Sequence, residues 1–545
     1  MDGTSTDYDL IVVGAGINGL GIAQDAANRG LSVIVLEKDD LCSGVSAWSG
    51  RLVHGGLRYL EHRDFALVRE SLRERERLFR NASHLVKPVR LLMPTYAHNR
   101  RPAWMIRLGM IAYDVLSFDK KTEGHRALNK RKTLARFPGI GQQGLTGAVV
   151  FTDGQVEYAE RLCVEVAVAA ARRGAQIRTK ANVDQVIMEN GRAAGVRYVD
   201  TRTGVRHEVR APLILNVAGP WIDRVFADDI PPQPRLNGGT KGSHLIVNPF
   251  PGAPNDVVYY ESRKDGRLVL VIPWMGRYLI GTTDLRFERD PDEARCDTDE
   301  LEYLLAEVNE LIPEANLTPD DVLFTYSGVR PLPYAPDVPE WEVPRSHVLH
   351  DHAPSVPGLI TVVGGKLTTY RQLAQDAVDD TFARLGRTAP PCTTADEALP
   401  GQIDNPAALV AQLQSAGFSG RTAARLVNRY GARATDVTAL AASDTSLAQV
   451  IDEQTGAIAA EVVFSVREEF AVTLTDVLAR RLLLAFEPGH GSAATARSVE
   501  LLSAELGWDA DEQQAQVREY QEWVARLAVP HAESSTHTPV VPENV

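Results

Sequence analysis

The stretch Gly14-Ala15-Gly16-Ile17-Asn18-Gly19 decides the fold of this 545-residue chain. It follows an apolar run at residues 9–13, typical of a buried parallel strand, and it begins a helical pattern over residues 16–29. A second apolar run at residues 31–36 ends at Glu37, 18 positions beyond Gly19. A glycine-rich turn between strand and helix, with an acid after the next strand, predicts a βαβ unit that binds a dinucleotide.

Each residue of this motif has a physical task. We expect Gly14 to form the turn, Gly16 to let the backbone approach a pyrophosphate, and Gly19 to pack the helix against the strand. The helix N-terminus offers free N–H groups, and Glu37 can accept hydrogen bonds from ribose hydroxyls. A second match to the pattern at residues 139–144 follows Pro138 and precedes an apolar strand, so we interpret it as a loop. The sequence therefore predicts one dinucleotide and does not favour NAD(P) as a second substrate.

Later segments favour FAD over NAD as that dinucleotide. A hairpin is expected over residues 193–199 and 205–209, followed by a buried strand at 213–217 that leads into Ala218-Gly219-Pro220. Another buried strand at 359–363 precedes Gly364-Gly365-Lys366-Leu367-Thr368-Thr369. Between them, the runs 257–260, 268–272 and 278–280 predict an antiparallel group. A site assembled from segments so far apart suits a large, tightly held cofactor.

Composition limits the function classes. The formal net charge is −13, which disfavours nucleic acid as a partner. Residues 395–545 hold 10 Arg, no Lys and 21 Asp or Glu, so the acid is concentrated in a C-terminal module with a helical pattern. The four cysteines are far apart in the sequence and form no metal-ligand spacing, so we expect neither a disulfide framework nor a metal site. No targeting segment or apolar run of ~20 residues occurs, so we expect a cytoplasmic protein; peripheral attachment to the cytoplasmic face of a membrane stays open.

Basic and histidine side chains recur in glycine-containing turns. His54 and Arg58 lie four residues apart, Arg330 lies between glycine and proline, Lys366 follows two glycines, and Lys241 precedes His244 by three positions. Any one of these is more often a surface charge or a structural donor. Together, in one cofactor-binding core, they predict a pocket for an anion.

The chain resembles the FAD-dependent, quinone-linked glycerol-3-phosphate dehydrogenases, called aerobic in bacteria. The resemblance covers about residues 8–372. Besides the glycine motif, it rests on the segments His54-Gly55-Gly56-Leu57-Arg58-Tyr59-Leu60-Glu61, Pro102-Ala103-Trp104-Met105, Gly219-Pro220-Trp221, Lys241-Gly242-Ser243-His244, Pro273-Trp274, Ile280-Gly281-Thr282-Thr283-Asp284, Tyr326-Ser327-Gly328-Val329-Arg330-Pro331-Leu332 and Gly364-Gly365-Lys366-Leu367-Thr368-Thr369-Tyr370-Arg371.

The resemblance implies oxidation of sn-glycerol 3-phosphate at C2 to dihydroxyacetone phosphate, with hydride passing to flavin N5 and electrons to a membrane quinone. It implies Arg58, Arg330 and Lys366 as substrate-binding cations and His54 near the reacting hydroxyl, with Tyr59 and His244 as lesser candidates. A homodimer stays open. We expect FAD contacts from Gly14, Gly16, Asn18, Gly19, Glu37, Lys38, Ser46, Ser49, Gly55, Gly56, Val183, Ala218, Gly219, Gly364, Gly365, Lys366, Leu367 and Thr368.

The predicted fold is α/β: a Rossmann-type FAD-binding domain, an antiparallel-sheet substrate domain and a C-terminal all-helical domain. We assign residues 1–90, 150–220 and 345–390 to the discontinuous FAD-binding domain, and 91–149 and 221–344 to the substrate-binding domain. Residues 391–402 form a linker, 403–531 the helical domain, and 532–545 a disordered tail.

Two positions depart from the family pattern. Trp48 is bulky where the family has small residues, and Val217-Ala218 replaces Ala-Thr before Gly219.

The sequence leaves two other functions open. One is another FAD oxidase or dehydrogenase of the same fold, acting on an amino acid or a 2-hydroxy acid. The other is a flavin-binding redox sensor or scaffold whose acidic C-terminal module binds a partner.

Overall fold

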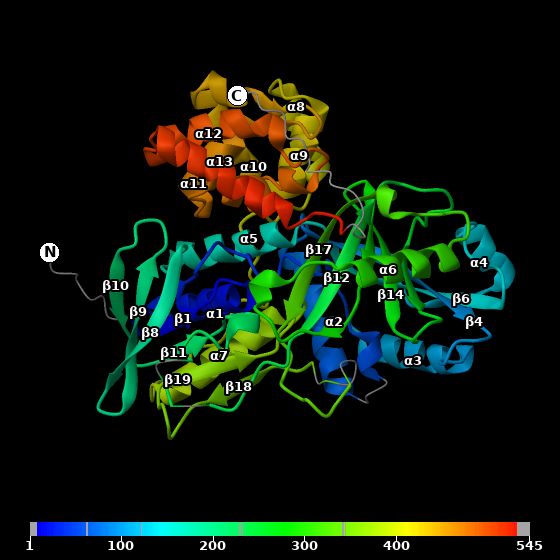
Figure 1. Ribbon diagram of the computed structural model, residues 1–545, viewed down its shortest axis with the longest axis horizontal. Helices are drawn as coiled ribbons and strands as arrows, with labels where there is room; N and C mark the ends of the chain where they lie inside the picture. The colour runs from blue at the N-terminus through cyan, green and yellow to red at the C-terminus, as the bar shows by residue number, and fades with distance from the viewer. Residues whose placement is uncertain are drawn as a thin grey trace.

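The computed structural model describes residues 8–60, 64–120, 122–227, 230–231, 233–339, 343 and 345–530. Two sheet regions lie side by side, and a helical C-terminal domain sits across them (Figure 1). The tail expected at residues 532–545 lies outside the described residues.

A six-stranded sheet carries the glycine motif. In spatial order its strands are β18 (Val348–Asp351), β19 (Leu359–Val363), β11 (Ile214–Asn216), β1 (Leu10–Val13), β2 (Val33–Leu36) and β7 (Gln176–Arg178). All neighbours are parallel except β18, which runs antiparallel to β19. The buried strands predicted in this region are therefore confirmed, and the βαβ unit is β1, α1 (Ile17–Asn28) and β2.

Helix α1 is buried on almost all sides. It packs against α5 (Ala159–Arg172) and α7 (Tyr370–Arg384) as well as against the sheet. A Cβ at Gly21 would lie 2.7 Å from the ring of Tyr370, so the small residue allows α1 and α7 to approach closely. This explains why α1 is apolar around most of its circumference rather than along one stripe.

A three-stranded antiparallel sheet covers one end of the first sheet. Its strands are β8 (Ala181–Glu189), β9 (Arg192–Asp200) and β10 (Arg206–Arg210). The predicted hairpin is β9 and β10, whereas β8 was not predicted from the sequence.

A ten-stranded sheet forms the second body. Its strands are β3 (Leu52–Val53), β4 (Val86–Tyr96), β5 (Arg126–Asn129), β6 (Leu145–Val156), β12 (Thr240–Val247), β13 (Val257–Glu261), β14 (Leu268–Trp274), β15 (Arg277–Gly281), β16 (Leu285–Arg286) and β17 (Val322–Arg330). The antiparallel group predicted at 257–280 is confirmed as β13, β14 and β15. The proposed boundaries at residues 90 and 150 fall inside β4 and β6, so each of these strands crosses from one assigned range into the other.

The second body also holds four helices. These are α2 (Phe65–Asn81), α3 (Ala103–Leu116), α4 (Lys130–Arg136) and α6 (Thr298–Leu311). The second glycine pattern, at residues 139–144, is a loop between α4 and β6, as predicted.

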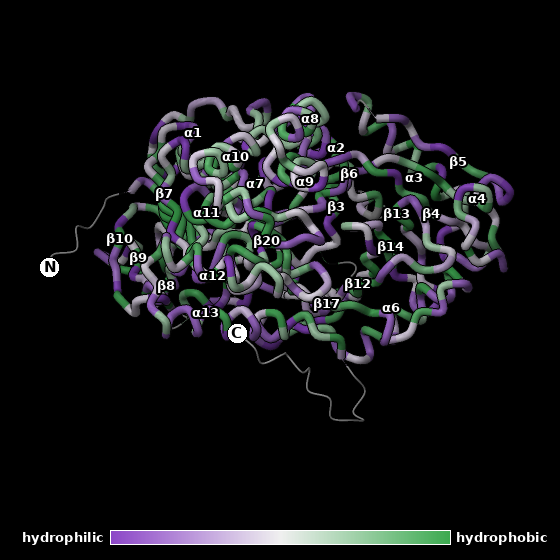
Figure 2. The backbone as a smooth tube through the Cα atoms, turned by 90° about the horizontal axis from the view of Figure 1, so that it is seen from above, coloured by the Kyte–Doolittle hydropathy of each residue, from purple (hydrophilic) through white to green (hydrophobic). Residues whose placement is uncertain are grey.

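Residues 387–405 contain no helix or strand and lead into the C-terminal domain. Its helices are α8 (Pro406–Ser415), α9 (Gly420–Tyr430), α10 (Ala434–Ser443), α11 (Ala459–Glu469), α12 (Ser492–Leu506) and α13 (Ala510–Ala525), with a π-helical segment η8 (Asp476–Arg481). The domain also contains a short ladder of β20 (Val450–Asp452) and β21 (Ala457–Ile458). Seen from above, hydrophilic residues predominate at the ends of the molecule, around α4 and β10 (Figure 2).

Candidate functional site

A cavity of about 460 Å³ lies at the carboxyl ends of β1, β2 and β11. The chain order reverses there, because β2 and β11 lie on opposite sides of β1, and open α/β sheets bind ligands at such switch points. The predicted residues that line the cavity are Gly14, Gly16, Asn18, Glu37, Lys38, Ser46, Val183, Ala218 and Gly219.

Two of the three glycines of the motif, Gly14 and Gly19, do the tasks expected of them, and the third borders the cavity. Gly14 has a φ of 109°, and a Cβ there would lie 2.7 Å from the carbonyl oxygen of Val217. A Cβ at Gly19 would lie 2.0 Å from the carbonyl oxygen of Gly14, so Gly19 is required for α1 to meet the turn. Gly16 is less crowded by protein, with Ser46 Oγ 3.5 Å from a Cβ placed there, and it borders the cavity instead.

Glu37 is held in place at the edge of the cavity. Its Oε2 accepts a hydrogen bond from the N–H of Ala15 at 2.7 Å, and its Oε1 accepts one from Asp39 at 3.0 Å. Burial raises the pKa of the Glu37 carboxyl, and the two N–H donors oppose that rise. Ser46 Oγ accepts from the N–H of Ile17 at 3.1 Å, so the loop after β2 reaches across to the start of α1.

The residues around the cavity fit FAD. Asn18 Oδ1 and Trp221 Nε1, both from lining residues, are buried and lack a hydrogen-bond partner among the described residues. The first turn of α1 contains no acidic residue, and Gly16 supplies no side-chain cap, so its N–H groups and dipole favour a bound anion. Unsatisfied polar atoms beside an anion-binding helix end suit a dinucleotide with a pyrophosphate.

Trp48 does not crowd this cavity. Its ring turns toward the C-terminal domain, where it stacks on Trp523 with ring centroids 5.9 Å apart and contacts Phe486 at 6.3 Å. The bulk that departs from the family pattern is therefore accommodated at a domain contact rather than against the cofactor. At the second departure, Ala218 lines the cavity without a hydroxyl.

The remaining predicted cofactor residues lie between this cavity and a second chamber. Thr368 Oγ1 accepts a hydrogen bond from the N–H of His54 at 3.2 Å, and a Cβ at Gly365 would lie 2.4 Å from Asn18 Nδ2. The segment after β19 thus contacts both the glycine motif and the His54 segment. The other members of this group are Ser49, Gly55, Gly56, Gly364, Lys366 and Leu367, and none of the six lines the first cavity.

The second chamber, of about 200 Å³, is lined by part of the predicted substrate set, and Lys366 is not among its lining residues. His54, Gly56, Tyr59 and Arg330 line it. It is also lined by polar residues that the sequence analysis did not select: Asp153, Arg267, Thr282, Asp284 and Arg345. Three arginines against two aspartates leave the lining of this small chamber with an excess of positive charge, which favours an anionic ligand.

His54 has a defined tautomer in this arrangement. Its Nδ1 accepts a hydrogen bond from the N–H of Gly56 at 3.1 Å, so the neutral ring carries its hydrogen on Nε2. Burial lowers the pKa of His54, Asp153 opposes this, and Lys366 and Arg345 lower it further. The ring is therefore neutral near pH 7 and acts as a hydrogen-bond donor at Nε2.

Lys366 lies above Tyr59, with its Nζ 4.4 Å from the ring centroid, and donates to Ser71 Oγ at 3.3 Å. Burial lowers the pKa of Lys366 to about 8, which Glu70 and Asp64 oppose. Its charge is thus poised to change just above neutral pH. A bound dianion would hold the ammonium in its charged form.

Arg330 is tied to the chamber wall. Its Nη1 donates to Asp284 Oδ1 at 3.0 Å and its Nη2 to Thr282 Oγ1 at 3.0 Å. Arg345 approaches the other oxygen of Asp284 at 3.6 Å. One carboxylate thus sets the positions of two guanidinium groups, and sequence reasoning found only one of them because Arg345 lies in a loop without a motif.

The structure places two other predicted side chains, those of His244 and Lys241, outside the chamber. His244 does not line the chamber; it is buried with its ring 4.8 Å from that of Tyr326, and burial with repulsion from Arg330 and Arg51 lowers its pKa to about 3. Lys241 pairs with Glu300 at 2.8 Å and with Asp297 at 2.9 Å, away from the chamber. Arg58 lies in a short 3₁₀ turn (Leu57–Leu60), and its side chain lies outside the described part of the structure.

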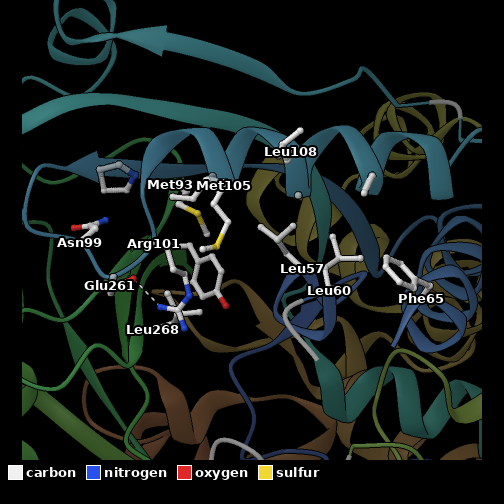
Figure 3. Close-up of a pocket in the computed structure, with 15 residues that line it drawn as sticks. Leu57, Leu60, Phe65, Met93, Asn99, Arg101, Met105, Leu108, Glu261 and Leu268 are labelled. Atoms are coloured by element: carbon white, nitrogen blue, oxygen red, sulfur yellow. Dashed lines mark hydrogen bonds and ion pairs between the residues drawn. The ribbon is translucent and has the colours of Figure 1, made fainter. Parts of the chain in front are cut away.

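A third, apolar cavity of about 370 Å³ adjoins the chamber and shares Leu57, Tyr259 and Leu268 with it. Leu57 and Leu60 lie below α3, Met105 points down from α3 toward Arg101 and Leu268, and the ion pair of Arg101 with Glu261 lies on that side (Figure 3).

Helix α3 above this cavity exposes an apolar stripe. The stripe consists of Trp104, Leu108, Ile111 and Val115, spaced by four, three and four residues. These side chains are 52–65% exposed, while Ile106, Met110 and Tyr113 on the opposite side are buried. A helix that is apolar on both sides and still exposed requires a further partner or surface.

A dinucleotide cavity at the switch point of a parallel sheet, with an arginine-lined chamber on a second sheet that begins one residue away, at Arg330 beside Pro331, defines a flavin-dependent oxidoreductase. The model of the family described as FAD dependent oxidoreductase matches residues 9–371, and the C-terminal domain of alpha-glycerophosphate oxidase matches residues 392–513.

Full-length relatives narrow the class. The chain is 42% identical over 540 residues to a glycerol-3-phosphate dehydrogenase of Synechocystis, covering 96% of this chain and 98% of that protein. It is 32% identical to an aerobic glycerol-3-phosphate dehydrogenase of Staphylococcus aureus, covering 87% and 86%. The crystal structure of the Bacillus halodurans glycerol-3-phosphate dehydrogenase with FAD superposes with a TM-score of 0.79 at 27% identity, covering 97% of both chains. The chain belongs to the FAD-dependent glycerol-3-phosphate dehydrogenases.

Proposed function

We propose that this protein oxidises sn-glycerol 3-phosphate at C2 to dihydroxyacetone phosphate and passes the electrons to a membrane quinone. The observation that carries the substrate assignment is the small chamber in which His54 meets Arg267, Arg330 and Arg345 beside the FAD cavity. A three-carbon phosphate matches its size and charge, and the names of the relatives above support the same substrate.

The residues around the chamber have different roles in binding and in chemistry. Arg330 and Arg345, both oriented by Asp284, bind the phosphate with Arg58 and Lys366. His54 donates from Nε2 to the C2 oxygen and stabilises it as the hydroxyl proton passes to solvent water; in the other tautomer, which requires release of the Gly56 N–H, His54 itself takes that proton. Tyr59 supports Lys366 through its ring. Bound FAD supplies a two-electron acceptor whose N5 receives the hydride from C2.

The apolar cavity under α3 suits the electron acceptor. A quinone ring is flat and apolar, and this cavity adjoins the substrate chamber through Leu57, Tyr259 and Leu268. We propose that the quinone head group enters here, next to the chamber that would bind the substrate.

The surface around α3 supports peripheral attachment to a membrane. Residues 98–136 contain 10 Lys or Arg against three Asp or Glu, in a chain whose net charge is −13. An apolar helix stripe with surrounding basic residues is typical of a segment that lies at an anionic lipid surface. Among the residues that the structure describes, no helix combines the length and the apolar character needed to cross a bilayer.

The test is anaerobic mixing of the purified protein with sn-glycerol 3-phosphate while the visible absorbance of the flavin is followed. The expected result is bleaching by this substrate and recovery of colour on addition of a quinone. Bleaching by glycine or lactate, but not by glycerol 3-phosphate, would favour the alternative of an amino-acid or 2-hydroxy-acid oxidase. The absence of bleaching by any of them would favour a redox sensor or scaffold. Homodimerisation stays a prediction that sedimentation of the same sample would test.

A further inference from the structure

The helical C-terminal domain contacts the loop that encloses the FAD cavity. This loop follows β2 and runs from Glu37 to Trp48; its inner side carries Glu37, Ser43 and Ser46, which line the cavity. Its outer side contacts the C-terminal domain through Asp39, Asp40 and Trp48. Two kinds of contact join them, one ionic and one aromatic.

The ionic contact is buried and geometrically specific. Arg481, from η8, donates from its two terminal nitrogens to the two oxygens of Asp40, both at 2.8 Å, and neither side chain is exposed. Arg480 pairs with Asp39 at 3.2 Å and with Asp40 at 3.4 Å. Consecutive arginines of one π-helical segment thus hold consecutive acids of the loop. π-Helical segments are rare and frequently occur at functional sites.

A lysine connects this contact with the FAD-binding sheet. Lys180, between β7 and β8, bridges Asp39 at 2.9 Å and Asp476 of the C-terminal domain at 3.0 Å. Burial raises the pKa of Asp39, but the attraction of Arg480 and Lys180 outweighs it and holds the pKa well below its usual range. The N–H of Asp39 then donates to Glu37. A continuous chain of contacts therefore runs from Arg480 to the carboxylate at the edge of the cavity.

The aromatic contact acts at the other end of the loop. Trp48 stacks on Trp523 of α13, two positions after Ser46, which caps the first turn of α1 through the N–H of Ile17. Both ends of the loop's inner surface are therefore supported from outside by the C-terminal domain.

We infer that the C-terminal domain is a clamp that positions the residue 37–48 loop over bound FAD, so that docking of this domain and retention of FAD stabilise each other. Thermodynamic linkage makes this reciprocal: a domain that favours the FAD-bound loop is itself favoured by FAD. The inference depends on FAD binding and not on the substrate proposed above, so its failure and that of the proposed substrate are separate outcomes. Arg480, Arg481 and Trp523 act in it as positioning residues.

The chain offers a matched control for the test. Arg433 of the C-terminal domain forms an equally buried pair with Glu165 of α5 at 2.7 Å and another with Glu469 of its own domain at 2.8 Å, and neither acid belongs to the loop. Glu469 also accepts a bond from Arg481 through its main-chain carbonyl, which Arg433→Met does not remove. Arg433→Met and Arg481→Met therefore break comparable contacts between the same two parts of the molecule, and only the second releases the loop. Trp523→Leu and Trp508→Leu form a second pair, since Trp508 is half-buried in the turn between α12 and α13.

The experiment measures the release of FAD from each diluted holoenzyme by flavin fluorescence, together with its melting temperature with and without added FAD. We expect Arg481→Met and Trp523→Leu to release FAD at least about tenfold faster, because each frees one end of the loop. A tenfold change corresponds to about 1.4 kcal/mol. Arg433→Met and Trp508→Leu should lower the melting temperature and leave the release rate within about twofold. Arg481→Lys should restore part of the retention.

Equal acceleration of FAD release by Arg481→Met and Arg433→Met, at equal loss of melting temperature, would overturn the inference in favour of a purely structural contact. Unchanged FAD release in Arg481→Met, with the protein folded, would overturn it as well.

Discussion

The main-chain N–H of His54 donates to the side-chain hydroxyl of Thr368 at 3.2 Å, across 314 positions of sequence. This bond joins the segment that supplies the chamber's histidine to the segment that supplies Lys366. The contact between the segments that follow β3 and β19 therefore fixes the position of His54 relative to Lys366. The 3₁₀ turn (Leu57–Leu60) is not the sole determinant of that position.

The first prediction concerns the role of His54. An Asn side chain can donate a hydrogen bond much as the Nε2–H does, whereas Ala cannot. We expect His54→Ala to lower kcat by about 100-fold and His54→Asn to retain a substantial part of the activity. Steady-state kinetics with sn-glycerol 3-phosphate and a dye acceptor measure this. Equal losses in both variants would indicate that His54 acts as the base in its other tautomer.

The second prediction concerns Glu37. Replacing it with Ala removes the expected ribose contacts and leaves the N–H of Ala15 without its acceptor. We expect FAD binding to weaken by about 1.5–3 kcal/mol, as for hydrogen bonds to a charged group. Equilibrium titration of the apoprotein with FAD checks this, and Glu314→Ala, an exposed acid after α6, is the control. Wild-type affinity in Glu37→Ala would remove Glu37 from the cofactor site.

Much of the nucleotide-binding half could be predicted because its signals are local. The strand at Leu10–Val13, the glycine turn and Glu37 lie within one short segment, and their periodicity and spacing identify the unit. By contrast, β4 contains Lys87, Pro88 and Arg90, which do not form a strand pattern. That strand exists because β6 and β13 pair with it, and such pairing is not visible in the strand's own residues.

The candidate site was predicted in part for the same reason. Glycines beside Arg330 and Lys366 mark both in the sequence, although the turn predicted at Arg330 is wrong because this residue ends strand β17 and pairs with Thr240. Arg345 and Arg267 enter the chamber from unmarked segments. The side-chain direction of Trp48 depends on Trp523, which is far away in the sequence, so its effect on the cofactor could not be derived from residue size.

The third prediction concerns pH. Burial lowers the pKa of Lys366 to about 8, so its ammonium is charged below that pH and lost above it. Binding of a phosphate dianion needs the charge. We therefore expect the KM for glycerol 3-phosphate to rise as pH increases past about 8, while Lys366→Arg, which stays charged, should have a flatter profile. A KM that is independent of pH up to 10 in the wild type would contradict the role of Lys366 as a substrate cation.

The fourth prediction concerns the stripe on α3. Ile111→Ser combined with Val115→Ser removes two exposed apolar side chains that do not line the apolar cavity, each worth about 1.5–3 kcal/mol when buried. We expect at least a 100-fold loss of binding to vesicles that contain phosphatidylglycerol, with dye-linked activity in solution unchanged. The control is Val205→Ser with Val348→Ser, two valines of similar exposure elsewhere. Equal vesicle binding by both double variants would exclude α3 as the lipid-facing segment.

The fifth prediction separates two arginines that share Asp284. Arg330 donates to Asp284, Thr282, Thr240 and the carbonyl of Thr283, so its guanidinium also holds strand β17 against the chamber wall. Arg345 approaches only the outer oxygen of the same carboxylate, at 3.6 Å, among the contacts that the described residues define. We expect Arg345→Ala to lower kcat/KM for glycerol 3-phosphate by at least ~2 kcal/mol, roughly 30-fold, with the melting temperature unchanged. Arg330→Ala should cost at least as much activity and also lower the melting temperature. Arg330→Lys should recover little, because an ammonium cannot satisfy acceptors in four directions.

Plain glycerol is the control substrate, because it has no phosphate. Arg345→Ala should leave its slow oxidation nearly unchanged, whereas Arg330→Ala should reduce it because the chamber wall is lost. Kinetics on both substrates, beside thermal melting and FAD content, decide the matter. A loss on glycerol equal to that on glycerol 3-phosphate in Arg345→Ala would show that Arg345 supports the chamber and does not bind the phosphate.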